Sequence, residues 1–154
     1  MHRPVTSRLG LALLCTAMAC IARRPASVES QQAQVRAATR HYADLVLAMN
    51  HHAIAELFTP DGEIRADDQP PIHGREAIER HLQAFAAYKV LEESLTADAI
   101  EMSTGGAHVS GTYHQRVRLP TGEVVTVGGE YTADWVLTPS SGWHIKRMAT
   151  TAAR

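Results

Sequence analysis

Cysteine is nearly absent from this chain of 154 residues, and its absence excludes several kinds of site. The only two cysteines are Cys15 and Cys20. A domain that begins after them has no disulfide framework, no thiolate zinc site and no cysteine nucleophile. Histidine pairs four residues apart are missing too, and the adjacent His51 and His52 would point about 100° apart on a helix. We therefore predict no metal and no cofactor.

Long hydrophobic runs are also lacking. The longest apolar stretch, residues 9–22, has 14 residues, whereas a membrane-spanning helix needs about 20. It follows a basic start with Arg3 and Arg8, and it contains small residues at Ala17 and Ala19. This order is typical of a secretory signal peptide. We predict a signal peptide over residues 1–22 and an exported protein, periplasmic or secreted.

Cys20 leaves two forms of export open. A small residue directly before a cysteine resembles the cleavage box of bacterial lipoproteins, although Ala17 stands where leucine is common. Cys20 therefore either carries a lipid anchor or is removed with the signal peptide.

Positive charge is not concentrated anywhere in the remaining chain. Without the first 22 residues it has 13 Lys and Arg against 16 Asp and Glu, a net charge of −3 with neutral histidines. Nucleic-acid binding needs clustered positive charge, so we predict no nucleic-acid partner.

Helical periodicity dominates the first half of the chain. We expect a linker over residues 23–30 and one domain over 31–152. A long amphipathic helix starts near Ser27, and a short helix over 51–58 is capped by Asn50. The apolar residues on one face of the long helix recur at spacings of three, four and seven: Val35, Ala38, Tyr42, Leu45, Val46 and Met49.

Turn residues then separate the helices. Thr59 to Gly62 predicts a turn, and residues 63–66 a short strand. Asp67 to His73 contains two prolines and predicts an irregular loop. A third helix opens at Gly74 and turns Ile78, Leu82 and Phe85 inward.

The second half of the chain changes to a period of two. Short turns with glycine, proline and serine separate four strand-like runs, over residues 90–102, 107–119, 123–137 and 143–150. Helices followed by an antiparallel meander predict a single α+β domain, with the helices packed on one face of the sheet.

Several features in this order resemble the nuclear transport factor two-like superfamily. They are a short helix ending in Leu57-Phe58, an acidic turn at Asp61-Gly62, the run Ile72 to Ile78, and a last strand starting Gly142-Trp143-His144-Ile145. Within that superfamily the chain is most similar to the SnoaL-like polyketide-cyclase and ketosteroid-isomerase group, over roughly residues 31 to 150.

The resemblance implies a cone-shaped α+β fold: three N-terminal helices packed on a strongly curved antiparallel sheet. It also implies an apolar pocket for a small molecule, and a homodimer formed through the convex sheet face. A filled cone without a ligand is the alternative to the pocket.

The resemblance also suggests catalytic residues. Tyr42 matches the position at which ketosteroid isomerases carry a tyrosine that donates a hydrogen bond to the developing enolate. Their base would fall on Ala66 and their second acid near Ala133, and here the neighbours Asp67 and Asp134 are acidic instead. The acid pattern of the epoxide-hydrolase relatives and the histidine pattern of the dehydratase relatives are not matched in full.

Strand alternation predicts the ligand-contacting side chains. Along the strands at 107–119 and 123–137, the more apolar set of residues should face the concave side. The pocket candidates in this set are Tyr113, Gln115, Tyr131 and Trp135. The acidic, proline-rich loop adds Asp67 and His73 at the rim.

Two functions remain open. The first is general acid-base chemistry of the isomerase, dehydratase or cyclase kind, in which Tyr42 polarises an oxygen and Asp67 or His73 moves a proton. The second is a non-catalytic ligand- or protein-binding module of the cell envelope. An acid or histidine inside the cavity would favour the enzyme.

Overall fold

The computed structural model describes residues 27–153. The expected signal peptide at 1–22, the candidate anchor Cys20 and the first part of the linker at 23–30 lie outside the described residues. Within 27–153, no helix is long and apolar enough to cross a membrane.

The helix α1 runs from Val28 to Leu47 and begins where the Oγ of Ser27 accepts a hydrogen bond from the amide of Ser30, at 3.2 Å. Its buried stripe contains Val35, Thr39 and Tyr42. The hydroxyl of Thr39 donates to the carbonyl of Val35 at 3.0 Å, so this one buried polar group is satisfied within the helix.

The short helix α2, His51–Glu56, is capped by the Asn50 side chain, as the sequence predicts. The expected continuation of this helix to Phe58, and the turn after it, are wrong. Phe58 begins the strand β1, Phe58–Ala66, which includes the segment from Thr59 to Gly62. The reason is tertiary, because β1 pairs in parallel with the last strand and its register shifts between Phe58 and Glu63.

The sheet has seven strands in the order β2-β1-β7-β6-β5-β3, with β4 also paired to β5. The runs in the second half of the chain pair antiparallel, as predicted. The sheet differs from the expected four strands in having seven, and in the parallel pair of β1 with β7. The remaining strands are β2 (Ile72–His73), β3 (Lys89–Leu95), β4 (Ala99–Ser103), β5 (Gly106–Arg118), β6 (Val124–Thr138) and β7 (Gly142–Ala152).

Two further boundaries differ from the sequence prediction. The expected strand over 90–102 is two strands, β3 and β4, which pair with successive parts of the long β5. In the segment 67–73, which was expected to be a loop, the last two residues form the strand β2. Ile72 and His73 pair there with Ile64 and Glu63 of β1. Both differences depend on partner strands that are distant in sequence.

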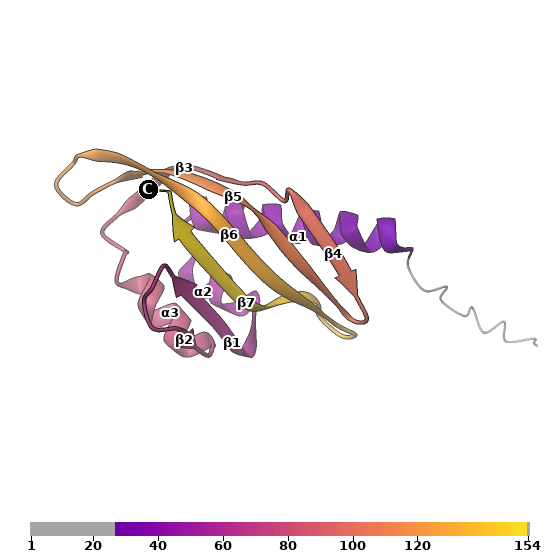
Figure 1. Ribbon diagram of the computed structural model, residues 1–154. Coiled ribbons are helices and arrows are strands. Elements are labelled where there is room, and N and C mark those ends of the chain that lie inside the picture. Colours follow the sequence, from indigo (N-terminus) through magenta and orange to yellow (C-terminus); the bar gives the residue numbers. More distant parts are fainter. Residues whose placement is uncertain (1–26, 154) are drawn as a thin grey trace, which may run out of the picture.

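The sheet curls around α1 without closing, and the helices α2 and α3 (Arg75–Gln83) lie at one end of it, beside β1 and β2 (Figure 1). The buried core joins this concave face to the helices. Its largest fully buried side chains are Trp135, Phe58, Ile54, Ile78, Ile145, Met148, Val35 and Val109. This arrangement agrees with the predicted α+β cone.

Glycine permits two close backbone contacts in the curled sheet. A Cβ on Gly111 would lie 2.0 Å from the carbonyl oxygen of Thr96, and one on Gly129 would lie 2.0 Å from that of Thr151. Both contacts are with backbone, which cannot move aside as a flexible side chain would. The strong bend of β5 and β6 therefore depends on the missing side chains.

We predict that Gly111→Ala lowers the free energy of unfolding by roughly 1–3 kcal/mol or more, because the new methyl group overlaps a carbonyl oxygen. Urea unfolding followed by circular dichroism measures the change. His114→Ala, on the exposed face of the same strand, is the control and should stay within about 0.5 kcal/mol of the unmodified protein. Equal stability of the two variants would contradict the argument.

Candidate functional site

A cavity of about 230 Å³ lies between α1 and the concave face of the sheet. Side chains from α1, β3, β5, β6 and β7 line it: Tyr42, Glu93, Leu95, Tyr113, Gln115, Val127, Tyr131, Met148 and Thr150. We call this space the inner cavity. Its wall combines three phenols, one carboxyl group, one amide and the hydroxyl of Thr150 with the side chains of Leu95, Val127 and Met148, so it offers hydrogen bonds within apolar surroundings.

A second cavity of about 340 Å³ adjoins it, and we call this one the outer cavity. Tyr42, Gln115 and Val127 line both spaces. The rest of its wall is mostly aliphatic and aromatic: Val46, Met49, His51, Ile54, Leu82, Phe85, Tyr88, Val90, Val117, Leu119 and Val125. Concave apolar surfaces with a few convergent polar groups are the usual form of a small-molecule site.

Tyr42 lies on the buried stripe of α1, at the junction of the two cavities. Its side chain is buried, with 8% of the residue exposed. Burial raises the pKa of its phenol well above the ordinary range, and the nearby Glu93 carboxylate raises it further. The hydroxyl therefore keeps its proton at neutral pH and can donate a hydrogen bond.

Glu93 is the acidic group of the inner cavity. It lies on β3, opposite Gln115 of β5. Both of its carboxylate oxygens are buried and neither has a hydrogen-bond partner. A buried carboxyl group without a partner is unfavourable for folding and is often found at functional sites.

Burial raises the pKa of Glu93 from 4.5 to about 7. The Gln115 side chain lowers this pKa in part, although its amide does not reach regular hydrogen-bond geometry with the carboxylate. Burial is the larger effect because it disfavours the charged form. At neutral pH the carboxyl group is therefore divided between its protonated and ionised forms.

Glu93 was not among the predicted residues, because strand alternation was applied only to the runs at 107–119 and 123–137. A bulge also makes its direction ambiguous from sequence. Val90 pairs with Val117 and Glu92 pairs with Arg116, with a shift of register between them. Alternation counted from Val90 would thus turn Glu93 outward. Alternation counted from Leu95, which lines the inner cavity, would have turned Glu93 inward and identified it.

Tyr113 and Gln115, two predicted ligand-binding residues, both line the inner cavity. Their strand β5 turns these side chains toward α1, as the alternation predicts. Burial raises the pKa of the Tyr113 phenol, and the carboxylates of Asp67 and Glu93 raise it further. The charges of two carboxylates thus favour the protonated form of this phenol.

Tyr131 and Trp135 have different surroundings although they share a face of β6. Tyr131 lines the inner cavity, and its hydroxyl donates to the carbonyl of Thr96 at 2.7 Å. Burial, and then the charge of Asp98, raises its pKa to about 12. Trp135 lines neither cavity: it is 1% exposed and packs in the core, so its predicted contact with a ligand is not supported by its position.

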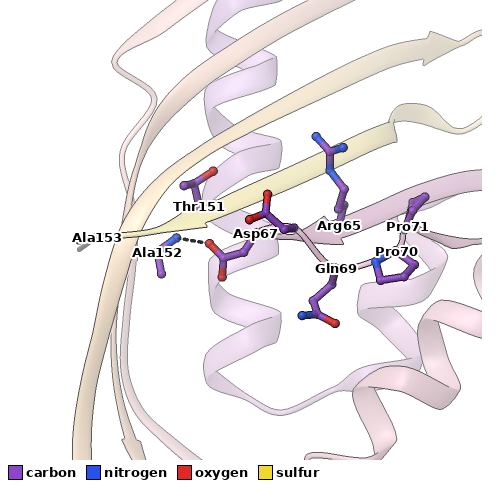
Figure 2. Close-up of a pocket in the computed structure, with 9 residues that line it drawn as sticks. Arg65, Asp67, Gln69, Pro70, Pro71, Thr151, Ala152 and Ala153 are labelled. Carbon is purple, nitrogen blue, oxygen red and sulfur yellow. Dashed lines mark hydrogen bonds between the residues drawn. The ribbon is translucent and has the colours of Figure 1, made fainter.

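Asp67, predicted as catalytic, lies at the end of β1 with a left-handed backbone (φ 47°). Its Oδ1 accepts a hydrogen bond from the amide of Ala152 at 2.7 Å, and both residues line an open groove of about 730 Å³ (Figure 2). Asp68, Pro70 and Pro71 line the same groove. Asp67 therefore holds the end of β7 and acts on the inner cavity only through its charge.

His73 is separated from the Tyr42 cavities. It pairs with Glu63 at 3.7 Å on the exposed side of the sheet and lines a different cleft, together with Pro60 and Arg75. The structure thus does not bring together the predicted set of Tyr42, Asp67 and His73. Within residues 27–153, no three His, Cys, Asp or Glu side chains are grouped so that they could hold a metal ion.

Comparison with solved structures gives the same fold. A ketosteroid isomerase-like protein from Erwinia carotovora atroseptica is 16% identical, with a TM-score of 0.71 over 79% of this chain and 95% of that one. A nuclear transport factor 2-like superfamily protein from Salmonella enterica serovar Typhimurium is 12% identical, with a TM-score of 0.71 over 83% and 94%.

A third similar structure is that of a protein from Catenulispora acidiphila in complex with S-DNPA. It is 18% identical, with a TM-score of 0.70 over 80% of this chain and 94% of that one. At these identities the similarity concerns the fold. None of the curated proteins matches the sequence.

A family model describes most of the folded region. The model of the SnoaL-like domain matches residues 29–149. This range includes every residue that lines the two cavities except Thr150. The match agrees with the helix-and-curled-sheet architecture and with the solved structures. The chain belongs to the SnoaL-like domain family, and its fold is that of the ketosteroid isomerase-like and nuclear transport factor 2-like structures.

Proposed function

We propose that this protein binds a small, largely apolar molecule in the joined inner and outer cavities, and acts on it by general acid-base chemistry of the isomerase, dehydratase or cyclase kind. In this proposal Glu93 moves a proton to or from the ligand. Tyr42 donates a hydrogen bond to a polar atom of the same molecule.

The observation that carries the proposal is the unpartnered, buried carboxyl group of Glu93 next to Tyr42. A general acid or base works best when its pKa lies near the working pH, and Glu93 has a pKa of about 7. A module that only binds its ligand can have a wholly apolar wall, whereas the wall of the inner cavity contains Glu93 and three phenols.

Tyr42 and Glu93 have complementary chemistry. The phenol remains protonated, so it can stabilise negative charge that develops on an oxygen. The carboxylate accepts a proton in its ionised form and returns it in its neutral form. The solved complex of the Catenulispora acidiphila protein with S-DNPA supports a ligand-binding use of this fold.

Asp67 and His73 have smaller roles in this proposal than the sequence predicts. Asp67 contributes negative charge at the rim and fixes the end of β7 through Ala152. The proposal retains export of the protein, with the first 22 residues as the signal, and pairing of two chains through the outer face of the sheet.

The pKa of Glu93 can be tested directly. Because its pKa is higher in the folded chain than its ordinary value of 4.5, its contribution to stability is full below pH 4.5 and is lost as the pH rises through about 7. The free energy of unfolding of Glu93→Gln, relative to that of the unmodified protein, should therefore increase from pH 5 to pH 8. We expect a gain on the order of 1–2 kcal/mol, discounted for partial solvent screening.

Urea unfolding at the two pH values measures this gain, and ¹³C NMR of the carboxyl group measures the pKa. Glu92→Gln is the matched control, because Glu92 lies on the outer face and pairs with Arg116. A Glu93 carboxyl that titrates near 4.5 would contradict the acid-base proposal.

Ligand binding can be tested by closing the cavity. Val127 lines both spaces and is 42% exposed, so Val127→Trp should fill the passage without overpacking the core. Native mass spectrometry of protein purified from its own organism should show a retained molecule that this variant lacks. Val124→Trp is the control, since Val124 is equally exposed and lines neither cavity. Retention of the same molecule by Val127→Trp would count against the site.

Proton transfer can be tested on the retained molecule. In D₂O the unmodified protein should catalyse deuterium incorporation at a carbon atom of that molecule, and Glu93→Gln should slow this exchange by roughly 10²-fold or more. Mass spectrometry of the recovered molecule follows the exchange. Glu92→Gln should behave like the unmodified protein. Equal exchange rates for all three proteins would rule out Glu93 as the proton carrier.

A further inference from the structure

The inner cavity contains a carboxyl group but no positive charge. None of the residues that line it is Lys, Arg or His, and Glu93 takes part in no ion pair within residues 27–153. Among the described residues, the ionised carboxylate therefore has no partner for its charge. In a buried site this is unfavourable unless a partner is supplied from outside.

The surrounding groups favour a positive partner over a negative one. Tyr42 from α1, Tyr113 from β5 and Tyr131 from β6 face Glu93 in the same space. Phenols offer oxygen acceptors and electron-rich ring faces, both of which attract organic cations.

More distant carboxylates act in the same direction. The charge of Asp67 reaches Tyr113, and the charge of Asp98 reaches Tyr131. Met148 and Thr150 of β7 carry no charge, and the only titratable groups of the outer cavity besides Tyr42 are His51 and Tyr88. The inner cavity is thus the negative end of a mostly apolar space.

We propose that the ligand is an organic amine, protonated at neutral pH, whose cationic nitrogen lies against Glu93 and whose apolar body occupies the outer cavity. This inference rests on the proposed ligand-binding function and names the class of its ligand. The two cavities meet at Tyr42, Gln115 and Val127, so one molecule can extend through both. A carboxylate ligand would meet like charge and be excluded.

The inference also concerns the proton on Glu93. A cation beside the carboxyl group favours its ionised form. Binding of the amine therefore converts Glu93 to the form that accepts a proton, and it releases a proton to solvent when it occurs below pH 7. A neutral ligand has no such effect.

Three probes of matched shape test the charge preference: 4-phenylbutylamine, 4-phenylbutan-1-ol and 4-phenylbutanoate. Isothermal titration calorimetry at pH 8 should give at least tenfold tighter binding for the amine than for the alcohol, and the weakest binding for the carboxylate. The affinity of the amine should rise between pH 6 and pH 8, whereas that of the alcohol should not.

Glu93→Gln should remove the preference for the amine and retain binding of the alcohol, while Glu92→Gln should keep the preference. Circular dichroism checks that both variants are folded. Equal binding of the amine and the alcohol, or an unchanged preference in Glu93→Gln, would overturn the amine inference alone. Failure of all three probes to bind the unmodified protein would contradict the ligand-binding function and the inference together.

Discussion

The curl of the sheet around α1 is the constraint on which the rest of the structure depends. The apolar stripe of the helix must be buried, and the concave face supplies the matching surface. The bend brings backbone groups so close together that only glycine fits at residues 111 and 129. The same curl places α1 against the concave face (Figure 1), and the cavities next to Tyr42 lie between this helix and the sheet.

The site is built from elements that meet only in the folded chain. Tyr42 comes from the first helix and Glu93 from a strand about fifty residues later, and the Glu93 carboxylate adds to the rise in the pKa of the Tyr42 phenol. The core around them is apolar, so charge in the cavity is weakly screened. A single acidic residue therefore supplies the negative charge of the inner cavity.

Much of the fold could be predicted from local pattern. The caps at Ser27 and Asn50, the helical stripe with Tyr42 and the alternation of β5 and β6 are all signals within short windows. The prediction of Tyr113 and Gln115 on the concave face held because β5 and β6 pair without a break of register along their length. Where the ladder is regular, side-chain direction follows from sequence parity.

The structure corrects the sequence predictions at the places where strand pairing is non-local. The sequence alone determined the α+β class, the lack of cysteine after Cys20 and the place of Tyr42 on the apolar stripe of the first helix, because composition and periodicity are properties of the chain itself. Only the tertiary structure decided that Phe58 starts a strand, that a bulge turns Glu93 inward, and that Asp67 bonds to Ala152 instead of lining the cavity. The register of a strand is chosen by its partner, and one residue of shift exchanges the inside and outside of the cavity wall.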